Sequence, residues 1–150
     1  MWVNTSRWLN ALVILFLCSS CSRQPQPINY GNDECVLCKM GIIDQKFGAE
    51  MVTKKGKVFK FDSGECMINF VRNGNVKESD IASYWVVDAM QPKKLIDALK
   101  AFYVHTENFP SPMGGNISAF ETREELQQFR QQYGGQEWSW EDLKTKVKKI

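Results

Sequence analysis

Residues 47–75 read FGAEMVTKKGKVFKFDSGECMINFVRNGN, and this stretch determines which fold the sequence predicts. It opens with two β-prone runs around a lysine–lysine–glycine turn, a pattern typical of a β-hairpin. Asp62 or Ser63 can then cap a helix, whose apolar residues recur at helical spacing until Gly74 can end it. SYWVVDA at 83–89 is a further β-prone run, so the first half predicts the order strand, strand, helix, strand.

The second half repeats this order at a constant offset of 59 residues. Residues 61–65, FDSGE, align with residues 120–124, FETRE, and Phe70 aligns with Phe129. The second unit is expected to contain strands at 101–105 and 116–120, a helix from Thr122 to Tyr133 stopped by Gly134-Gly135, and a closing strand beginning with QEWSW. We therefore expect an α+β fold in which two similar ββαβ units, about 35–90 and 91–150, pack together.

Two further segments carry apolar residues at helical spacing. KKLIDALKA, residues 93–101, has apolar residues at helical spacing, but the stretch from Asp88 to Ala101 could equally bridge the two halves. WEDLKTKVKKI, residues 140–150, predicts a surface helix with lysines on one face and an apolar stripe on the other, formed by Leu143, Val147 and Ile150.

The N-terminus has the three parts of an export signal: Arg7, a short apolar stretch from Trp8 to Leu17, and small residues before a cysteine. That stretch is shorter than the roughly 20 residues that span a bilayer. Cys18-Ser19-Ser20-Cys21 resembles a bacterial lipobox, although Cys18 stands where leucine is usual. We expect removal of residues 1–20 and a lipid anchor on Cys21, with plain secretion and a free Cys21 as the alternative.

This N-terminus predicts an exported protein anchored to a bacterial membrane, facing the periplasm or the cell exterior. Residues 21–34 are polar and contain prolines, so we expect the lipidated cysteine and a flexible tether there, followed by a domain at 35–150. Without Arg7, 18 basic residues balance 17 acidic ones, and no strong field favours nucleic acid. No G-x-S-x-G, P-loop or G-x-G-x-x-G motif occurs, and one histidine offers little acid–base chemistry, so we expect no enzyme.

Three cysteines remain in the expected domain, and an odd number cannot form a closed set of disulfides. Cys35 and Cys38 belong to a C-x-x-C-x-M motif in which Met40 adds a thioether, and thiolate with thioether is a soft ligand set that selects Cu(I). The further candidate ligands are Cys66 in the predicted helix, Met113 in the loop PSPMGG, and the single histidine, His105.

Each candidate also has a less specific interpretation. Cys35 and Cys38 could form a disulfide or the redox pair of a thiol–disulfide oxidoreductase, and either could pair with His105 as a nucleophile. Met40 and Cys66 could be core residues, and His105 a packed or surface residue. A structural zinc site is also open, with the permissible ligand set Cys35, Cys38, Cys66 and His105. Asp62 and Asp88 are expected to be cap or turn residues.

Taken in order, these motifs resemble those of the NosL family of copper-binding lipoproteins, which are accessory proteins of nitrous oxide reductase. The resemblance covers roughly residues 35–135. It rests on the C-x-x-C-x-M motif (Cys35, Cys38, Met40), FDSGECM at 61–67, the WVVD strand at 85–88, DALKAFYV at 97–104 and SPMGGNISAF at 111–120.

The resemblance implies two ββαβ units related to the metal-binding domain of organomercurial lyase. It implies Cu(I) held by Cys35 or Cys38 and by Met40 or Met113, with Cys66 as a secondary candidate, whereas His105 matches no family motif. It also implies, as partners, a membrane assembly machinery and a copper recipient: the copper–sulfide cluster of nitrous oxide reductase or another exported copper enzyme. The expectation from residues and resemblance together is a lipid-anchored Cu(I) metallochaperone.

Overall fold

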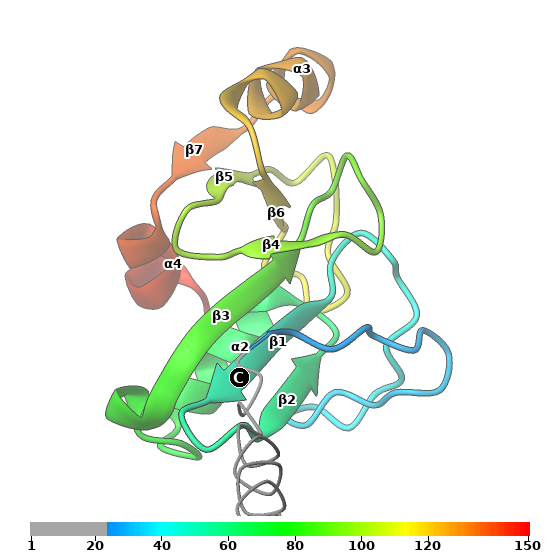
Figure 1. Ribbon diagram of the computed structural model, residues 1–150. Helices are drawn as coiled ribbons and strands as arrows, with labels where there is room; N and C mark the ends of the chain where they lie inside the picture. Colours follow the sequence, from blue (N-terminus) through cyan, green and yellow to red (C-terminus); the bar gives the residue numbers. More distant parts are fainter. Residues whose placement is uncertain (1–23) are drawn as a thin grey trace, which may run out of the picture.

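The structure is a computed structural model of the 150-residue chain, and it describes residues 24–150 (Figure 1). The expected signal peptide and Cys21 lie outside these residues. Among the helices described, none has the length and apolar character needed to cross a lipid bilayer. In chain order the elements are β1 (Ala49–Thr53), β2 (Val58–Phe61), α2 (Gly64–Arg72), β3 (Ile81–Val87), β4 (Leu95–Asp97), β5 (Phe102–His105), β6 (Ile117–Phe120), α3 (Arg123–Tyr133), β7 (Gln136–Trp138) and α4 (Trp140–Lys146).

The hairpin expected at 47–61 is formed by β1 and β2, which pair antiparallel from Ala49 opposite Phe61 to Val52 opposite Val58. Its turn requires Gly56, whose φ of +80° is a conformation that residues with a β-carbon rarely adopt. α2 follows directly, and Ser63 is its N-cap because the Ser63 side chain accepts a hydrogen bond from the Cys66 N–H. The sequence prediction of strand, strand and helix is therefore confirmed here.

The first sheet has four strands in the order β2-β1-β3-β4. β3 pairs antiparallel with β1, and β4 pairs antiparallel with β3. The segment 93–101 therefore forms a short edge strand and a turn instead of the helix that its spacing also allowed. Ile96 explains this outcome, because it pairs with Val86 and is buried as part of the sheet.

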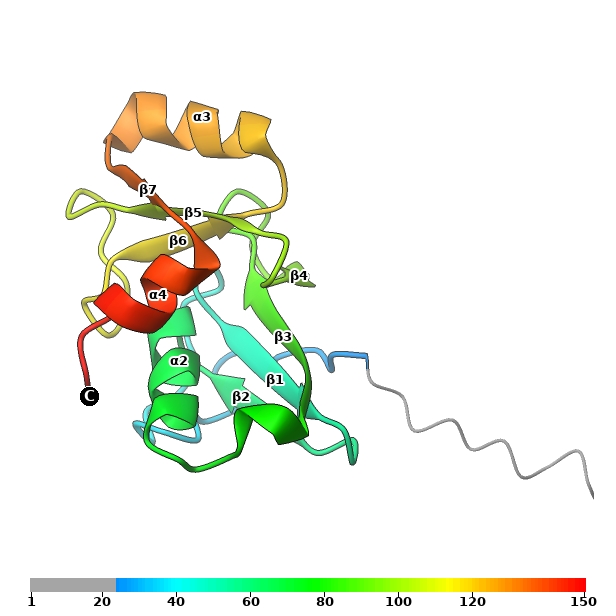
Figure 2. The same ribbon diagram turned by 90° about the vertical axis from the view of Figure 1, so that its left-hand side faces the viewer.

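The second sheet has three strands in the order β6-β5-β7, all antiparallel neighbours. α3 begins with a capping box, in which Thr122 and Glu125 exchange side-chain and backbone hydrogen bonds. Gly134, with φ of +70°, follows its last turn. The order β5, β6, α3, β7 confirms the expected second ββαβ unit, and Figure 2 shows α3 on the outer side of its sheet.

α4 packs between the two units, against α2 and β7 (Figure 2). Leu143 is buried in the larger core, and Arg72 of α2 donates to the carbonyl oxygens of Lys144 and Val147 at 2.6 and 2.8 Å. The helix ends at Lys146, earlier than expected, because the backbone of Val147 is no longer helical. Ile150 therefore lies outside the helix and is about half exposed.

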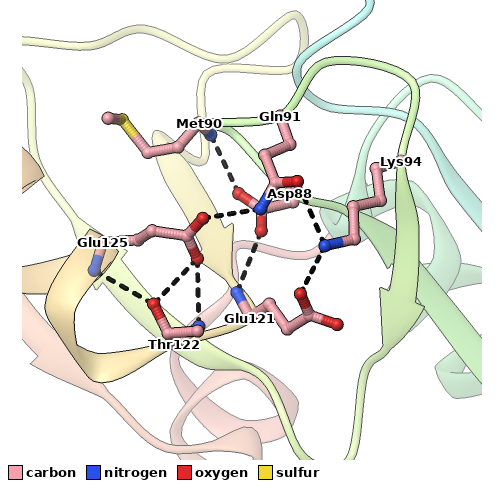
Figure 3. Close-up of polar contacts among 7 residues, drawn as sticks. All are labelled: Asp88, Met90, Gln91, Lys94, Glu121, Thr122 and Glu125. Carbon is pink, nitrogen blue, oxygen red and sulfur yellow. Dashed lines mark hydrogen bonds and ion pairs between the residues drawn. The ribbon is translucent and has the colours of Figure 1, made fainter.

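A buried carboxylate joins the two sheets (Figure 3). Asp88 follows β3 and accepts hydrogen bonds from the backbone N–H groups of Met90 and Glu121, at 2.9 and 3.1 Å. Lys94 extends this junction, because its ammonium group contacts both Gln91 and the Glu121 carboxylate. The bond from Met90 agrees with the expectation that Asp88 is a turn residue. The bond from Glu121 attaches the connection between β6 and α3 to the end of β3.

The segment expected to be a tether differs from a free linker in its second half. Ile28 is buried and packs against Gly48, and the N–H of Gln26 donates to Glu50 at 2.7 Å. Glu34 forms an isolated antiparallel bridge with Gly41. The folded body therefore begins near Gln26. Burial of Ile28 stabilises this packing through the hydrophobic effect, even though the surrounding stretch is polar and contains prolines.

Candidate metal centre

Three thiols and one carboxylate converge where the loop 33–41 meets the start of α2. The ligand atoms of Cys35, Cys38, Asp62 and Cys66 all lie within 4.8 Å of one another, and the three cysteines are free thiols. We call this group the thiol cluster. The structure thus brings together all three cysteines of the described chain that the sequence offered as ligands.

The loop that carries Cys35 and Cys38 has a compact backbone. The Cys35 N–H donates to the Met40 carbonyl oxygen at 2.8 Å, and the Lys39 N–H donates back to the Cys35 carbonyl oxygen at 3.0 Å. Val36 anchors the loop to the edge of the first sheet by donating to the Lys60 carbonyl oxygen. The two-residue spacer therefore lies in a tight turn, with both thiols facing the same group of ligand atoms.

The other two members come from one short stretch between β2 and α2. Asp62 directly follows the last residue of β2, and Cys66 lies in the first turn of α2. Ser63 fixes this turn through its N-cap bond to Cys66, at 3.4 Å. The hairpin-to-helix connection that determines the fold therefore also places half of the thiol cluster.

The cluster favours a single thiolate. The pKa of Cys35 is lowered to about 6, because Cys66 donates its S–H to the Cys35 sulfur and backbone N–H groups, including that of Asp62, add to this against the effect of burial. Burial raises the pKa of Cys38 to about 11. The pKa of Cys66 is also raised, first by its bond to Cys35 and then by burial. At neutral pH the arrangement is one thiolate beside two protonated thiols.

Burial leaves the cluster one side from which it can be approached. Cys35 and Cys66 are fully buried and Asp62 is nearly so, whereas Cys38 is half-buried. The Cys38 thiol donates to Asp62 Oδ2 at 3.5 Å, while Oδ1 is buried and has no hydrogen-bond partner among the described residues. An unpaired buried carboxylate oxygen is costly. A cation held by the sulfurs would offset that cost, so the donor set fits a thiophilic metal ion.

The two methionine candidates lie at different depths. Met40 belongs to the cysteine loop, and its side chain is 46% exposed. Met113 is half-buried and packs against the same hydrophobic core that contains Cys35 and Cys66. The Met40 side chain is therefore open to solvent, whereas Met113 lies against the body of the protein.

The structure places His105 elsewhere. It lies on β5, with its ring stacked on Trp138 at 4.5 Å between centroids and its Nε2 3.6 Å from Glu107 Oε1. Among the His, Cys, Asp and Glu side chains of residues 24–150, the group able to hold a metal contains Asp62 and not His105. The fourth place in the zinc set considered from the sequence is therefore taken by a carboxylate.

Asp62 is the member that sequence reasoning missed. Its position between a strand and a helix is typical of a cap, yet Ser63 provides the cap bond. One signal could have found it: the aspartate stands four residues before Cys66, on the same short connection. That spacing gains meaning only once the loop 33–41 is known to pack there.

The protein is a small mixed α+β protein with a buried, thiol-rich cluster that could hold a metal ion. The sequence profile of the NosL family matches residues 27–148, and the chain belongs to that family. The crystal structure of the copper chaperone NosL from Shewanella denitrificans is 25% identical to this chain, with a TM-score of 0.71, and the match covers 83% of this chain and 98% of that one. No curated protein sequence matches. The expected family and fold class are thereby confirmed.

Proposed function

We propose that the protein is an exported, lipid-anchored carrier of Cu(I), a metallochaperone and not an enzyme. The observation that carries this proposal is the thiol cluster, whose ligand atoms lie within 4.8 Å of one another. Soft thiolate ligands select Cu(I) over harder cations. Membership in the NosL family and the likeness to a copper chaperone support copper as the cargo.

Cys35 provides the thiolate for uptake, because its lowered pKa of about 6 favours the charged form before any ion arrives. An ion approaching from the half-buried side meets Cys38 and then Cys35. When Cys38 ligates the ion, its S–H bond breaks, a sulfur–copper bond forms and a proton leaves. Asp62 Oδ2, which already accepts that S–H bond at 3.5 Å, is a ready acceptor for the proton.

Release proceeds by ligand exchange. Met40 is 46% exposed and Cys38 is half-buried, so a thiolate or thioether of a recipient can bind the ion while Cys35 still holds it. We propose that two or three soft ligands hold the ion at one time, drawn from the thiols and from the thioethers of Met40 and Met113. A set of two or three soft ligands suits transfer, whereas a closed set of four suits a structural site.

A structural zinc site is the second candidate, and one specific observation favours it. Cys35, Cys38, Cys66 and Asp62 provide a three-sulfur, one-oxygen set of the kind that zinc accepts. In this case the methionines contribute nothing to binding, and the protein without metal unfolds.

A thiol–disulfide oxidoreductase is less consistent with the geometry. The lowered pKa belongs to Cys35, which is fully buried, whereas reactive cysteines are at least partly exposed. The redox alternative also assigns no role to Asp62 or Cys66.

The test is an anaerobic Cu(I) titration, against a competing chelator, of a fragment of residues 22–150. The variants are Cys35→Ser, Met40→Leu and Met113→Leu, and His105→Ala is the control because His105 stacks on Trp138 away from the cluster. We expect binding of about one Cu(I), abolished or strongly weakened by Cys35→Ser, weakened by the methionine changes and unaffected by His105→Ala.

Two results would contradict copper carriage. Preferential Zn²⁺ binding that is unchanged in both methionine variants and lost with Asp62→Asn would favour the structural site. Absence of competitive Cu(I) binding would exclude the carrier, and the reduction potential of the Cys35–Cys38 pair would then be measured.

The anchor and the recipient are separate parts of the proposal. We propose that Cys21 carries the lipid, so Cys21→Ala should move the protein from the membrane fraction to the soluble fraction. The recipient that we propose is the copper–sulfide cluster of nitrous oxide reductase, reached through its membrane assembly machinery, or another exported copper enzyme. Deletion of the gene should then lower nitrous oxide reduction, and added copper should restore it in part. Unchanged reduction would favour another copper enzyme.

A further inference from the structure

The loop between β5 and β6 has a backbone fixed by its own polar side chains. The Ser111 N–H donates to Asn116 Oδ1 at 3.1 Å, and the Asn116 N–H donates to Ser111 Oγ at 2.8 Å. Asn116 Nδ2 also reaches Glu107 Oε2 at 2.5 Å. The residues between, including Met113, are therefore held at both ends of a short loop, which we call the 111–116 loop.

A buried carboxyl group attaches this loop to α2. Glu65, in the first turn of α2, is only 2% exposed. Its Oε1 accepts the hydroxyl hydrogen of Ser111 at 2.5 Å, and it also accepts a bond from the Ile117 N–H. Contact extends to Gly115, where an added β-carbon would lie 2.8 Å from the Glu65 carboxyl carbon. Figure 2 shows the loop, in yellow, beside α2.

The two ends of this contact carry two of the proposed copper ligands. Glu65 is adjacent to Cys66 in the chain, and Ser111 lies two residues before Met113. Met113 is half-buried against the core that contains Cys66. A buried polar contact therefore joins the helix that carries Cys66 to the loop that carries Met113, and such supporting contacts tune metal sites.

We propose that Glu65 is a positioning residue that holds the 111–116 loop, and with it Met113, in the place from which the thioether reaches copper bound by the thiol cluster. This inference rests on the proposed function, since it assumes that the thiols hold Cu(I). It assigns to Glu65 no contact with the ion. Gly115 is then required as glycine because the loop must approach the Glu65 side chain closely.

The test combines Glu65→Ala with Met113→Leu in a double-mutant cycle, measured as Cu(I) affinity by chelator competition in the fragment of residues 22–150. We expect Glu65→Ala to weaken affinity about 10–100-fold, and to cause no further loss once Met113 is replaced. Glu65→Gln retains an acceptor for the Ser111 hydroxyl and should retain most of the affinity. A second readout needs no copper: amide hydrogen exchange of residues 111–116 should become faster in Glu65→Ala.

Glu50→Ala is the matched control, because Glu50 is also a fully buried glutamate and its hydrogen bond goes to Gln26, away from this loop. It should leave exchange in the loop unchanged. Equal losses from Glu65→Ala with and without Met113, or unchanged loop exchange, would overturn the inference. Ser111→Ala, which removes only a hydroxyl, decides the same two points if Glu65→Ala does not fold. A wild-type fragment that takes up no Cu(I) would instead overturn the proposed function before any variant is compared.

Discussion

At the scale of single residues, the charge of Cys35 depends on a hydrogen bond from Cys66. That bond is the largest cause of the lowered Cys35 pKa of about 6. Cys66→Ala removes the donor, so the thiolate should form only at higher pH. The thiolate ultraviolet absorbance of the metal-free protein, titrated with pH, measures this change. Cys38→Ala provides the comparison, and a midpoint that stays near 6 in Cys66→Ala would contradict the assignment.

Glu50 gives a second prediction at this scale. Burial raises its pKa from 4.5 to about 6, so the folded state holds the proton more tightly than the unfolded state. The resulting stability is complete below pH about 4.5 and is lost as the pH rises through about 6. Glu50→Gln cannot ionise and should therefore gain, relative to wild type, up to about 2 kcal/mol between pH about 4.5 and 7.

Urea unfolding at several pH values measures this difference in the free energy of unfolding. Glu124→Gln is the control, because Glu124 is exposed on α3 and its replacement leaves no buried group changed. A difference between Glu50→Gln and wild type that is independent of pH would show that Glu50 does not titrate differently in the two states.

Candidate ligands could be predicted from the sequence where residue type and short spacing were enough to identify them. The C-x-x-C pair and Cys66 could be chosen because cysteines are few, and the structure brings all three together. Asp62 was missed because its contact with Cys38 joins residues 24 positions apart, and its spacing from Cys66 has meaning only once that contact is known. His105 stood out only as the single histidine, and its ring is stacked on Trp138 in the other sheet.

At the scale of elements, the two helix starts offer a direct comparison. Thr122 caps α3, which carries none of the cluster, whereas Ser63 caps α2, which carries Cys66. Either change to alanine should lower stability by about 1 kcal/mol. Only Ser63→Ala should also weaken Cu(I) binding, because it loosens the turn that holds Cys66. Chemical unfolding and chelator competition on both variants test this, and equal effects on copper would contradict it.

Elements were predicted well wherever a cap, a glycine and a periodic pattern agreed. The hairpin turn at Gly56 and the helix beginning at Thr122 are of this kind. The segment 93–101 was ambiguous because helical spacing and a short edge strand share the same apolar residues. Pairing of β4 with β3 decides between them, and that pairing is a long-range contact that no local pattern contains.

At the scale of the whole molecule, α4 connects the two units. Leu143 is 1% exposed and lies in the larger core, where α4 meets α2. Leu143→Ala should lower the free energy of unfolding by about 2–5 kcal/mol through lost burial and a cavity. If α4 makes the units one cooperative body, circular dichroism and tryptophan fluorescence should still report a single shared transition. Val147→Ala is a smaller truncation at the same contact and should cost less.

The repeat at an offset of 59 residues places Cys66 of α2 in register with Glu125 of α3. In α3 the glutamate closes a capping box by bonding back to Thr122, which satisfies a further helix-end donor. The corresponding cysteine cannot make that return bond, and its sulfur faces Cys35 instead. The start of α3 thus satisfies its own backbone donor, whereas the start of α2 has a candidate metal ligand at the same place. Replacing Cys66 with Glu would therefore make the two helix starts alike and would remove one of the three thiols from the cluster.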